Sequence, residues 1–309
     1  TIFLGTSIHA ASPEYPNRTI TVIVPYPAGG VTDLGGRALA ESMERHLKHP
    51  VVVVNKVGGA TTVGGYAVAS AKPDGYTLGF FPNSAVIPEA YAFFQEAPYT
   101  SKEIRPISGV VAPVLSVTVR EDAPWNSLQE LVAYARKNPG MKVGTGGRQT
   151  VQHMFATTLN KMEKTGFVAV PFSGDATNLP ALLGGHTSVG MMDYSVLKSL
   201  VEAKKVKVLA IVTNKRAEFA PTVPTVVELG YPIVYVPILG LVGPRGIPEE
   251  IVERLDSVVA KICTEEDFQT RMRNIPLQMR YENSATYEKS NLKYKENILA
   301  FFKEEGLMK

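Results

Sequence analysis

The sequence has a single cysteine, Cys263, among its 309 residues. One cysteine cannot form an internal disulfide or a set of thiolate ligands, so the sequence excludes a disulfide framework and a cysteine-based metal cluster. The redox compartment therefore cannot be read from cysteine usage. We interpret Cys263 as a small buried residue of a C-terminal helix.

Long hydrophobic runs and blocks of like charge are also missing. After the first residues, no stretch approaches the roughly 20 apolar residues that a membrane-spanning helix requires. The 32 basic and 29 acidic residues are interspersed and leave a net charge of +3, which makes nucleic acid a poor candidate partner. The composition, 45% hydrophobic and 20% charged, is typical of a water-soluble globular protein. At this length two domains are favoured over one.

The opening segment, from Thr1 to Ser12, is apolar and runs into small residues before a polar stretch that contains proline. This pattern is typical of the last part of a secretory signal, with cleavage near Ala10 or Ala11. A disordered terminus or a cloning remnant would give the same pattern. We expect residues 1–14 to be the remainder of a signal peptide or a disordered start, and the protein to be exported.

Short β-branched runs alternate with segments of helical spacing along the chain. Residues 19–26 and 51–55 are predicted strands, and residues 32–47 between them are a predicted helix. A second series of the same kind follows residue 119. The alternation predicts an α/β protein of two lobes, each a mixed sheet flanked by helices, with a ligand cleft between the lobes. We expect lobe 1 to comprise residues 15–118 and 234–309, and lobe 2 to comprise residues 119–233.

A glycine-rich turn joins the first predicted strand to the first predicted helix. Two adjacent glycines allow the backbone to approach a ligand, and the helix that follows offers unpaired N–H groups and a partial positive charge. Such a turn suits an anion. The same residues would also make a tight turn with an aspartate cap and no ligand. The candidate ligand residues here are Tyr26, Ala28, Gly29, Gly30, Val31, Thr32 and Asp33.

A second turn of this kind lies in the other predicted lobe, again between a strand and a helix. Thr150 is placed to cap that helix. Arg148 carries a planar fork of donors that matches a carboxylate, although a loop arginine can equally be solvated. The candidate ligand residues of this turn are Thr145, Gly146, Gly147, Arg148, Gln149 and Thr150.

Enzymatic patterns are weak. His46 and His49 have no carboxylate or cysteine at ligand spacing, which favours solvated side chains over a metal site. A hydrogen bond at a helix start explains the closeness of His153 and Thr150 without nucleophilic chemistry. The phosphate-loop, dinucleotide and serine-elbow motifs are absent from the sequence. We therefore expect no catalytic residue, no metal and no cofactor.

Several short motifs, in order and at consistent spacing from Tyr15 to the end, closely resemble the substrate-binding proteins of the tripartite tricarboxylate transporters, also called Bug receptors. Each motif is a weak signal, but their order and spacing together are specific. The motifs are Pro25–Asp33 with Arg37; Val54–Ala60 with Gly64; Lys72–Leu78; Gln152-His153; Val170–Gly174; Leu183–Gly185; Leu209–Thr213 with Arg216; and Val223–Thr225 with Glu228–Gly230.

The resemblance implies a periplasmic receptor that binds one small organic carboxylate, either a dicarboxylate or tricarboxylate or an aromatic acid. It implies delivery of that ligand to the large and small membrane permease subunits, and we expect a monomer. The family holds the nearer carboxylate through backbone groups of the two glycine-rich loops and ordered waters. Further positions match places near the family's pocket: Asn83, Ser84, Ser173 and Asp193.

The sequence departs from the family pattern at Arg148 and Gln149, where small residues and glycine are usual. These residues could block the usual backbone approach to the ligand, or Arg148 could pair with a second carboxylate. We favour the pairing, which an affinity measurement on Arg148→Ala would test. Tyr26, Phe81 and Tyr194 could stack on an aromatic ring, and all three could equally be ordinary wall residues. Two alternatives remain open at this point: a protein that presents its ligand to a sensor kinase, and a two-lobed enzyme.

Overall fold

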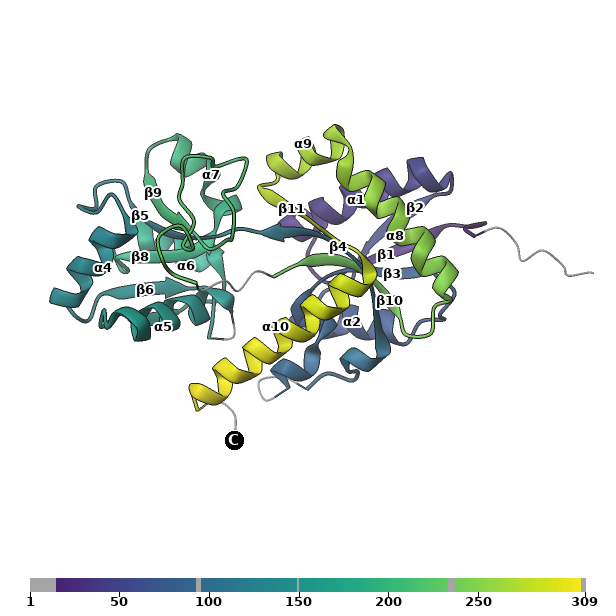
Figure 1. Cartoon of the computed structure of the whole chain (residues 1–309), viewed down its shortest axis with the longest axis horizontal. Helices are drawn as coiled ribbons and strands as arrows, with labels where there is room; N and C mark the ends of the chain where they lie inside the picture. Colours follow the sequence, from purple (N-terminus) through teal and green to yellow (C-terminus); the bar gives the residue numbers. More distant parts are fainter. Residues whose placement is uncertain (1–14, 93–95, 149, 233–236, 307–309) are drawn as a thin grey trace, which may run out of the picture.

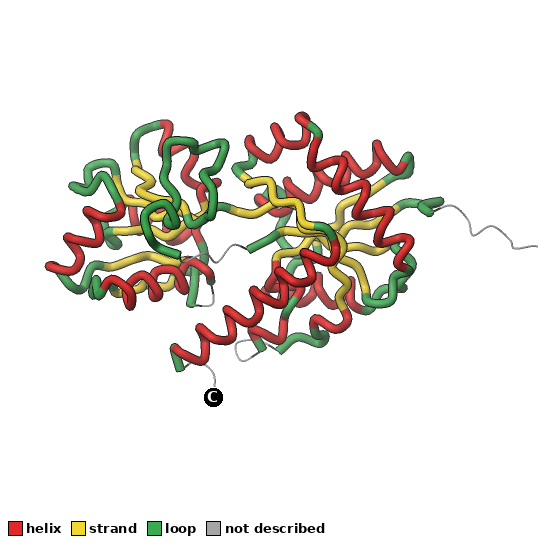
Figure 2. The backbone as a smooth tube through the Cα atoms, in the orientation of Figure 1, coloured by secondary structure: helices red, strands yellow, loops and turns green. Residues whose placement is uncertain are grey.

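The computed structural model describes residues 15–92, 96–148, 150–232 and 237–306. They form two lobes, each built on one mixed β-sheet with helices packed against it (Figures 1 and 2). The two-lobed α/β fold predicted from the sequence is therefore confirmed. Among the described residues, no helix is both long enough and apolar enough to cross a membrane. The predicted signal remainder, residues 1–14, lies outside the described residues.

The larger lobe contains a six-stranded sheet in the order β11-β4-β10-β3-β1-β2. β1 pairs in parallel with β2 and with β3, as right-handed βαβ connections require. β10 is antiparallel to β3 and β4, and β11 is antiparallel to β4. The strands are β1 (Ile20–Val24), β2 (Val51–Asn55), β3 (Thr77–Pro82), β4 (Ile104–Pro113), β10 (Leu239–Pro244) and β11 (Leu277–Glu282).

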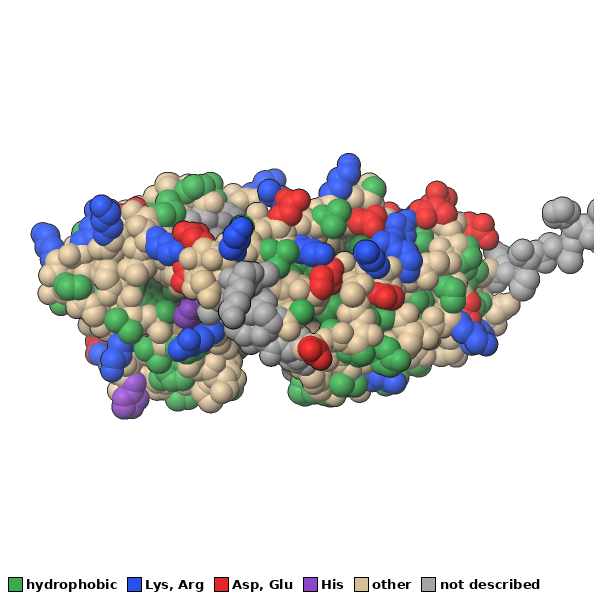
Figure 3. All heavy atoms as spheres, turned by 90° about the horizontal axis from the view of Figure 1, so that it is seen from below, with side chains coloured by type: hydrophobic (Ala, Val, Ile, Leu, Met, Phe, Trp, Pro, Cys, Tyr) green, Lys and Arg blue, Asp and Glu red, His purple; other side chains and the backbone are tan. Residues whose placement is uncertain are grey.

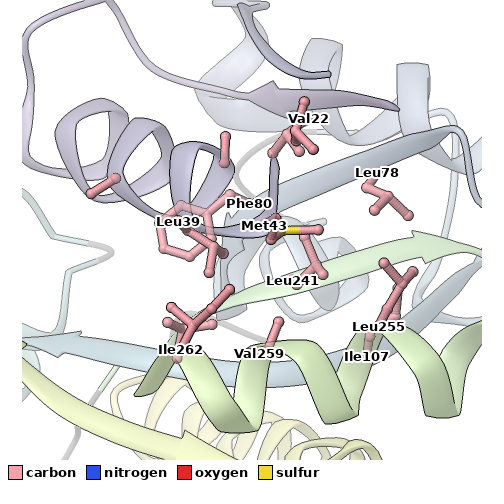
Figure 4. Close-up of a cluster of buried hydrophobic side chains, with 14 of the residues drawn as sticks. Val22, Leu39, Met43, Leu78, Phe80, Ile107, Leu241, Leu255, Val259 and Ile262 are labelled. Atoms are coloured by element: carbon pink, nitrogen blue, oxygen red, sulfur yellow. The ribbon is translucent and has the colours of Figure 1, made fainter. Parts of the chain in front are cut away.

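Helices cover both faces of this sheet. They are α1 (Val31–Leu47), α2 (Thr62–Ala69), α3 (Asn83–Val86), α8 (Glu249–Thr264), α9 (Glu266–Asn274) and α10 (Ser284–Glu304), with short 3-10 turns at Gly59–Thr61, Pro88–Tyr91 and Ser101–Glu103. The apolar stripes of α1 and α8 pack on one face of the sheet because their buried residues recur at helical spacing. Figure 4 shows this core, with Val22, Leu39, Met43, Leu78, Phe80, Ile107, Leu241, Leu255, Val259 and Ile262.

The smaller lobe has a five-stranded sheet in the order β7-β6-β8-β5-β9. β6 is parallel to β7 and β8, whereas β5 is antiparallel to β8 and β9. Its elements are β5 (Leu115–Arg120), α4 (Leu128–Lys137), β6 (Lys142–Thr145), α5 (Val151–Glu163), β7 (Val168–Pro171), α6 (Asp175–Leu183), β8 (Val189–Asp193), α7 (Tyr194–Glu202) and β9 (Val206–Ile211).

The chain passes between the lobes twice. It leaves the larger sheet at the end of β4 and enters the smaller sheet at β5, with only Val114 between them. It returns in the segment between β9 and β10. The boundary predicted after residue 118 falls within β5, whose paired residues all belong to the smaller sheet. The second boundary falls among residues 233–236, outside the described residues, so the lobe limits stay a prediction.

The last helix also links the lobes. α10 begins on the larger lobe and extends towards the smaller one (Figure 1). Met154 of α5 is fully buried in the same hydrophobic cluster as Phe301 and Phe302 of α10. Lys161 Nζ of α5 lies 2.9 Å from Glu304 Oε1 of α10. Because this ion pair is exposed to solvent, the buried Met154 contact contributes more to holding the lobes in this arrangement.

Candidate functional site

The first glycine-rich turn is organised by Asp33, whose side chain is buried within the larger lobe. Asp33 Oδ2 accepts hydrogen bonds from the Gly29 amide and from Arg37 Nε, each at 2.9 Å, and Asn55 Nδ2 donates to Asp33 Oδ1 at 2.7 Å. Burial opposes ionisation, but these bonds together outweigh it and hold the pKa of Asp33 below its usual value. Asp33 therefore stabilises the turn as a carboxylate.

In this turn the start of α1, and not the Gly29 amide, offers free hydrogen-bond donors. Gly29 has a positive φ of 83°, and its amide is already bonded to Asp33. The amides of Val31 and Thr32 have no hydrogen-bond partner among the described residues, as is usual in the first turn of a helix. The N-terminus of α1 consequently supplies both unpaired donors and the positive end of the helix dipole.

The second turn repeats this arrangement in the smaller lobe. The Gly146 amide donates to Gln152 Oε1 at 2.6 Å, so this glycine is also bonded within its own lobe. Thr150 Oγ1 accepts from the His153 amide at 3.3 Å, which confirms Thr150 as the N-cap of α5. The Val151 and Gln152 amides have no partner among the described residues. Gln149 lies outside those residues.

Both helix starts line one cavity of about 490 Å³ between the lobes. Figure 3 shows the molecule notched between the lobes, with basic and acidic side chains mixed around the notch. The lining residues come from both lobes. They are Tyr26, Val31, Thr32, Ala60, Thr61, Thr62, Pro82, Ser84, Pro88, Tyr91, Pro113, Thr150, Val151, Gln152, Asp193, Pro237, Leu239 and Tyr294.

A broader depression of about 930 Å³ lies elsewhere, along α1 and β2 at the outer edge of the larger lobe. Its lining mixes charged side chains, including Arg37, Glu41, Glu44 and Arg45, with apolar ones. It receives no residue of the smaller lobe from the described part of the chain and no helix N-terminus. We therefore place the candidate site in the cavity between the lobes.

The structure brings six of the predicted site residues to this cavity. They are Tyr26, Val31, Thr32, Ser84, Thr150 and Asp193. Other predicted residues lie outside its lining in this arrangement of the lobes. These are Ala28, Gly29, Gly30, Asp33, Asn83, Thr145, Gly146, Gly147, Arg148 and Ser173.

Several of the residues outside the lining have structural partners instead. Asn83 is buried and bonded to Asn291 and to the amide of Ile238. Thr145 is buried, with its hydroxyl 3.3 Å from His153 Nδ1. Arg148 is exposed, and its proposed pairing with a second carboxylate stays a prediction.

Of the three aromatic side chains that could stack on a ring, only Tyr26 lines the cavity. Phe81 is completely buried and Tyr194 packs against Phe219, and neither is among the lining residues. Tyr91 and Tyr294 line it instead. Nothing in the sequence pattern pointed to them, because they lie about 200 residues apart and only the fold brings them together. Gln152 was part of a recognised motif but was not proposed as a ligand residue.

A hydrogen-bonded chain of polar groups runs behind the smaller-lobe wall. Gln152 Nε2 donates to Asp175 Oδ1, and the Asp193 amide donates to Asp175 Oδ2, each at 2.9 Å. Burial and the neighbouring Asp175 raise the pKa of Asp193 to about 8, although backbone amides of Val114 and Ser195 oppose the shift. Asp193 is therefore mostly protonated at pH 7, and the cavity gains a negative charge only in alkaline solution.

Within the described ranges, no cluster of three or more His, Cys, Asp or Glu side chains could hold a metal ion. His153, the histidine nearest the cavity wall, has its pKa lowered by burial and by Arg148. Its ring contacts the buried Thr145 hydroxyl, which is not among the cavity-lining residues. The arrangement suits reversible binding of an anion.

Comparison with known proteins gives a consistent result. Residues 36–300 match the protein-family model described as tripartite tricarboxylate transporter family receptor. A Cupriavidus necator protein described as "UPF0065 protein in gbd 5'region" is 30% identical over 308 residues, covering 97% of this chain and 91% of the relative.

Solved structures agree in fold. A TctC solute-binding protein from Polaromonas is 29% identical, with a TM-score of 0.80 over 94% of this chain and 99% of that one. The periplasmic binding protein BugD is 28% identical, with a TM-score of 0.74 over 94% and 99%. MatC from Rhodopseudomonas palustris, solved with bound malate, is 26% identical, with a TM-score of 0.73 over 93% and 99%.

Proposed function

Because this chain belongs to the tripartite tricarboxylate transporter receptor family, we propose that it binds a small organic carboxylate between its lobes and delivers it to the membrane permease subunits of such a transporter. The family is one of solute receptors and not of enzymes. The malate in MatC and the periplasmic description of BugD support a carboxylate ligand and a periplasmic location. We further propose that the receptor acts as a monomer.

One observation carries this proposal: the first turns of α1 and α5, from opposite lobes, line the same cavity. Each offers unpaired amides and the positive end of a helix dipole, so a carboxylate between them would be bound from both sides. We propose that Thr32 and Thr150 contact it directly. The glycine turns, held by Asp33 and Gln152, then serve to position these helix starts.

Mass spectrometry of ligand retained through native purification tests the binding function. We expect a small organic acid that is released on denaturation and rebinds chemically unchanged in calorimetry. Failure of the protein to retain or bind any acid from a panel of malate, citrate, adipate and benzoate derivatives would contradict the proposal. For the transport role, deletion of the gene should abolish uptake of the identified acid, and an intact uptake rate would contradict that part.

The protonation of Asp193 makes ligand affinity depend on pH. We expect affinity for the identified acid to fall by up to about tenfold from pH 7 to pH 9, because ionisation near pH 8 puts a negative charge beside the bound anion. His153 is neutral throughout this range, since its pKa is lowered, and the cavity tyrosines have raised pKa values. Calorimetric titrations at pH 6, 7, 8 and 9 measure the effect.

The matched variants are Asp193→Asn, which should remove this pH dependence, and Asp122→Asn at an exposed loop position, which should keep it. Folding stability should also fall as the pH rises. Because the pKa of Asp193 is higher in the folded protein than in the unfolded chain, the contribution of its protonated form to stability is fully present in acid and is lost as the pH rises through about 8. An unchanged pH profile of affinity in Asp193→Asn would assign the dependence to another group.

A further inference from the structure

Three tyrosine side chains converge on the larger-lobe side of the cavity from distant parts of the chain. Tyr26 follows β1, Tyr91 ends a 3-10 turn, and Tyr294 lies in α10. The hydroxyl oxygens of Tyr91 and Tyr294 are 3.3 Å apart. Tyr26 interacts electrostatically with both of them and is hydrogen-bonded to Ser84. We call these three residues the tyrosine cluster.

The tyrosine cluster presents neutral hydrogen-bond donors. Burial raises the pKa of each hydroxyl, to about 12 for Tyr294, so all three keep their protons at neutral pH. The contact between Tyr91 and Tyr294 uses one O–H as the donor and leaves the other O–H. At least one phenol donor therefore remains for an acceptor in the cavity.

The cavity that the cluster lines is mostly apolar. Proline and aliphatic residues from both lobes contribute to its lining, and none of the described lining residues is Lys or Arg. A flat apolar body packs well against tyrosine and proline surfaces. Because Arg148 lies outside the cavity lining, a second full negative charge here would lose its hydration without gaining a cationic partner. The apolar wall residues are Val31, Pro82, Pro88, Pro113, Val151, Pro237 and Leu239.

We propose that the tyrosine cluster is a second subsite, which holds the far end of the ligand and selects an aromatic monocarboxylate with a neutral hydrogen-bond acceptor opposite its carboxylate. This inference rests on the proposed function, since the helix starts of α1 and α5 hold the carboxylate of the same ligand. Tyr91 and Tyr294 then determine specificity, and the phenol donors reject an analogue that leaves them unpaired.

The test compares two acids of nearly equal shape, 4-acetylbenzoate and 4-isopropylbenzoate, by calorimetry on the full chain. The acetyl oxygen can accept from the cluster, whereas the isopropyl group cannot. We expect the wild-type protein to bind the acetyl compound at least about tenfold more tightly. Tyr294→Phe and Tyr91→Phe should each reduce this preference to about threefold or less. Tyr134→Phe, at an exposed tyrosine of α4, should retain it.

Thermal melting checks that each variant is folded, and two independent cluster variants guard against the failure of one. A preference that persists in both variants, or tighter binding of citrate than of 4-acetylbenzoate by the wild type, would overturn the subsite. If the wild type binds neither benzoate but retains another organic acid through purification, the subsite is wrong and the receptor function stands. If it binds no carboxylic acid, the proposed function itself is wrong.

Discussion

Replacing Thr32 with glutamate is expected to lower the affinity for a carboxylate at least about 100-fold without weakening the fold. Thr32 lies in the first turn of α1 and lines the cavity. A glutamate there occupies the unpaired amides and opposes the ligand with a like charge. The same charge interacts favourably with the helix dipole, so the thermal stability of the variant should equal or exceed that of the wild type.

Two controls separate local charge from side-chain size and from net charge. Thr32→Gln introduces a side chain of nearly the same shape as glutamate but without its charge. It should lower the affinity by less than about tenfold. Thr286→Glu makes the same substitution in the first turn of α10, at an exposed position outside the cavity lining, and should leave affinity unchanged. If Thr32→Glu binds the ligand with an affinity within threefold of the wild type, the N-terminus of α1 does not contact the ligand.

Much of the fold could be predicted because its signals are local. The β-branched run at 19–26 contains β1, and the helical spacing at 32–47 matches α1 to within one residue. Glycine turns mark where a strand ends and the next helix begins, and parallel strands bring such turns to one edge of a sheet. The sequence therefore predicted two helix starts facing one cleft, and Thr32 and Thr150 both line the cavity between the lobes.

The parts that could not be predicted depend on partners distant in the sequence. Asp33 follows a glycine turn, which suggested contact with the ligand, but Asn55 from β2 and Arg37 hold its carboxylate inside the lobe. The tyrosine cluster requires α10 to lie against the turn that carries Tyr91. Neither the helical periodicity of α10 nor the composition around Tyr91 contains that information, because both would also suit an ordinary core contact.

Asn83 shows how a polar residue near a cleft can be structural. Its side chain donates to Asn291 Oδ1 at 2.8 Å and accepts from the Ile238 amide at 2.5 Å. Asn291 in turn donates to the Tyr287 carbonyl at 2.8 Å. These bonds fasten the end of β3 to α10 and to the segment that returns from the smaller lobe. Asn83 is thus positioned to hold the larger lobe together rather than to reach the ligand.

We expect Asn83→Ala to lower the free energy of unfolding by about 2–4 kcal/mol, because it leaves the Ile238 amide and the Asn291 oxygen buried without partners. Urea denaturation followed by circular dichroism measures the loss. Asn274→Ala, at an exposed helix end, should change stability by no more than about 0.5 kcal/mol. In a double-mutant cycle, Asn83→Ala and Asn291→Ala should show a coupling of about 1 kcal/mol.

Ligand affinity distinguishes this role from the contact with the ligand that the sequence suggested for Asn83. If Asn83 only supports the lobe, Asn83→Ala should bind the ligand within about threefold of the wild type at temperatures where it is fully folded. If Asn83 contacts the ligand, affinity should fall by roughly tenfold or more, since a buried hydrogen bond to a charged group is lost. A large loss of affinity with little change in the free energy of unfolding would show that Asn83 contacts the ligand.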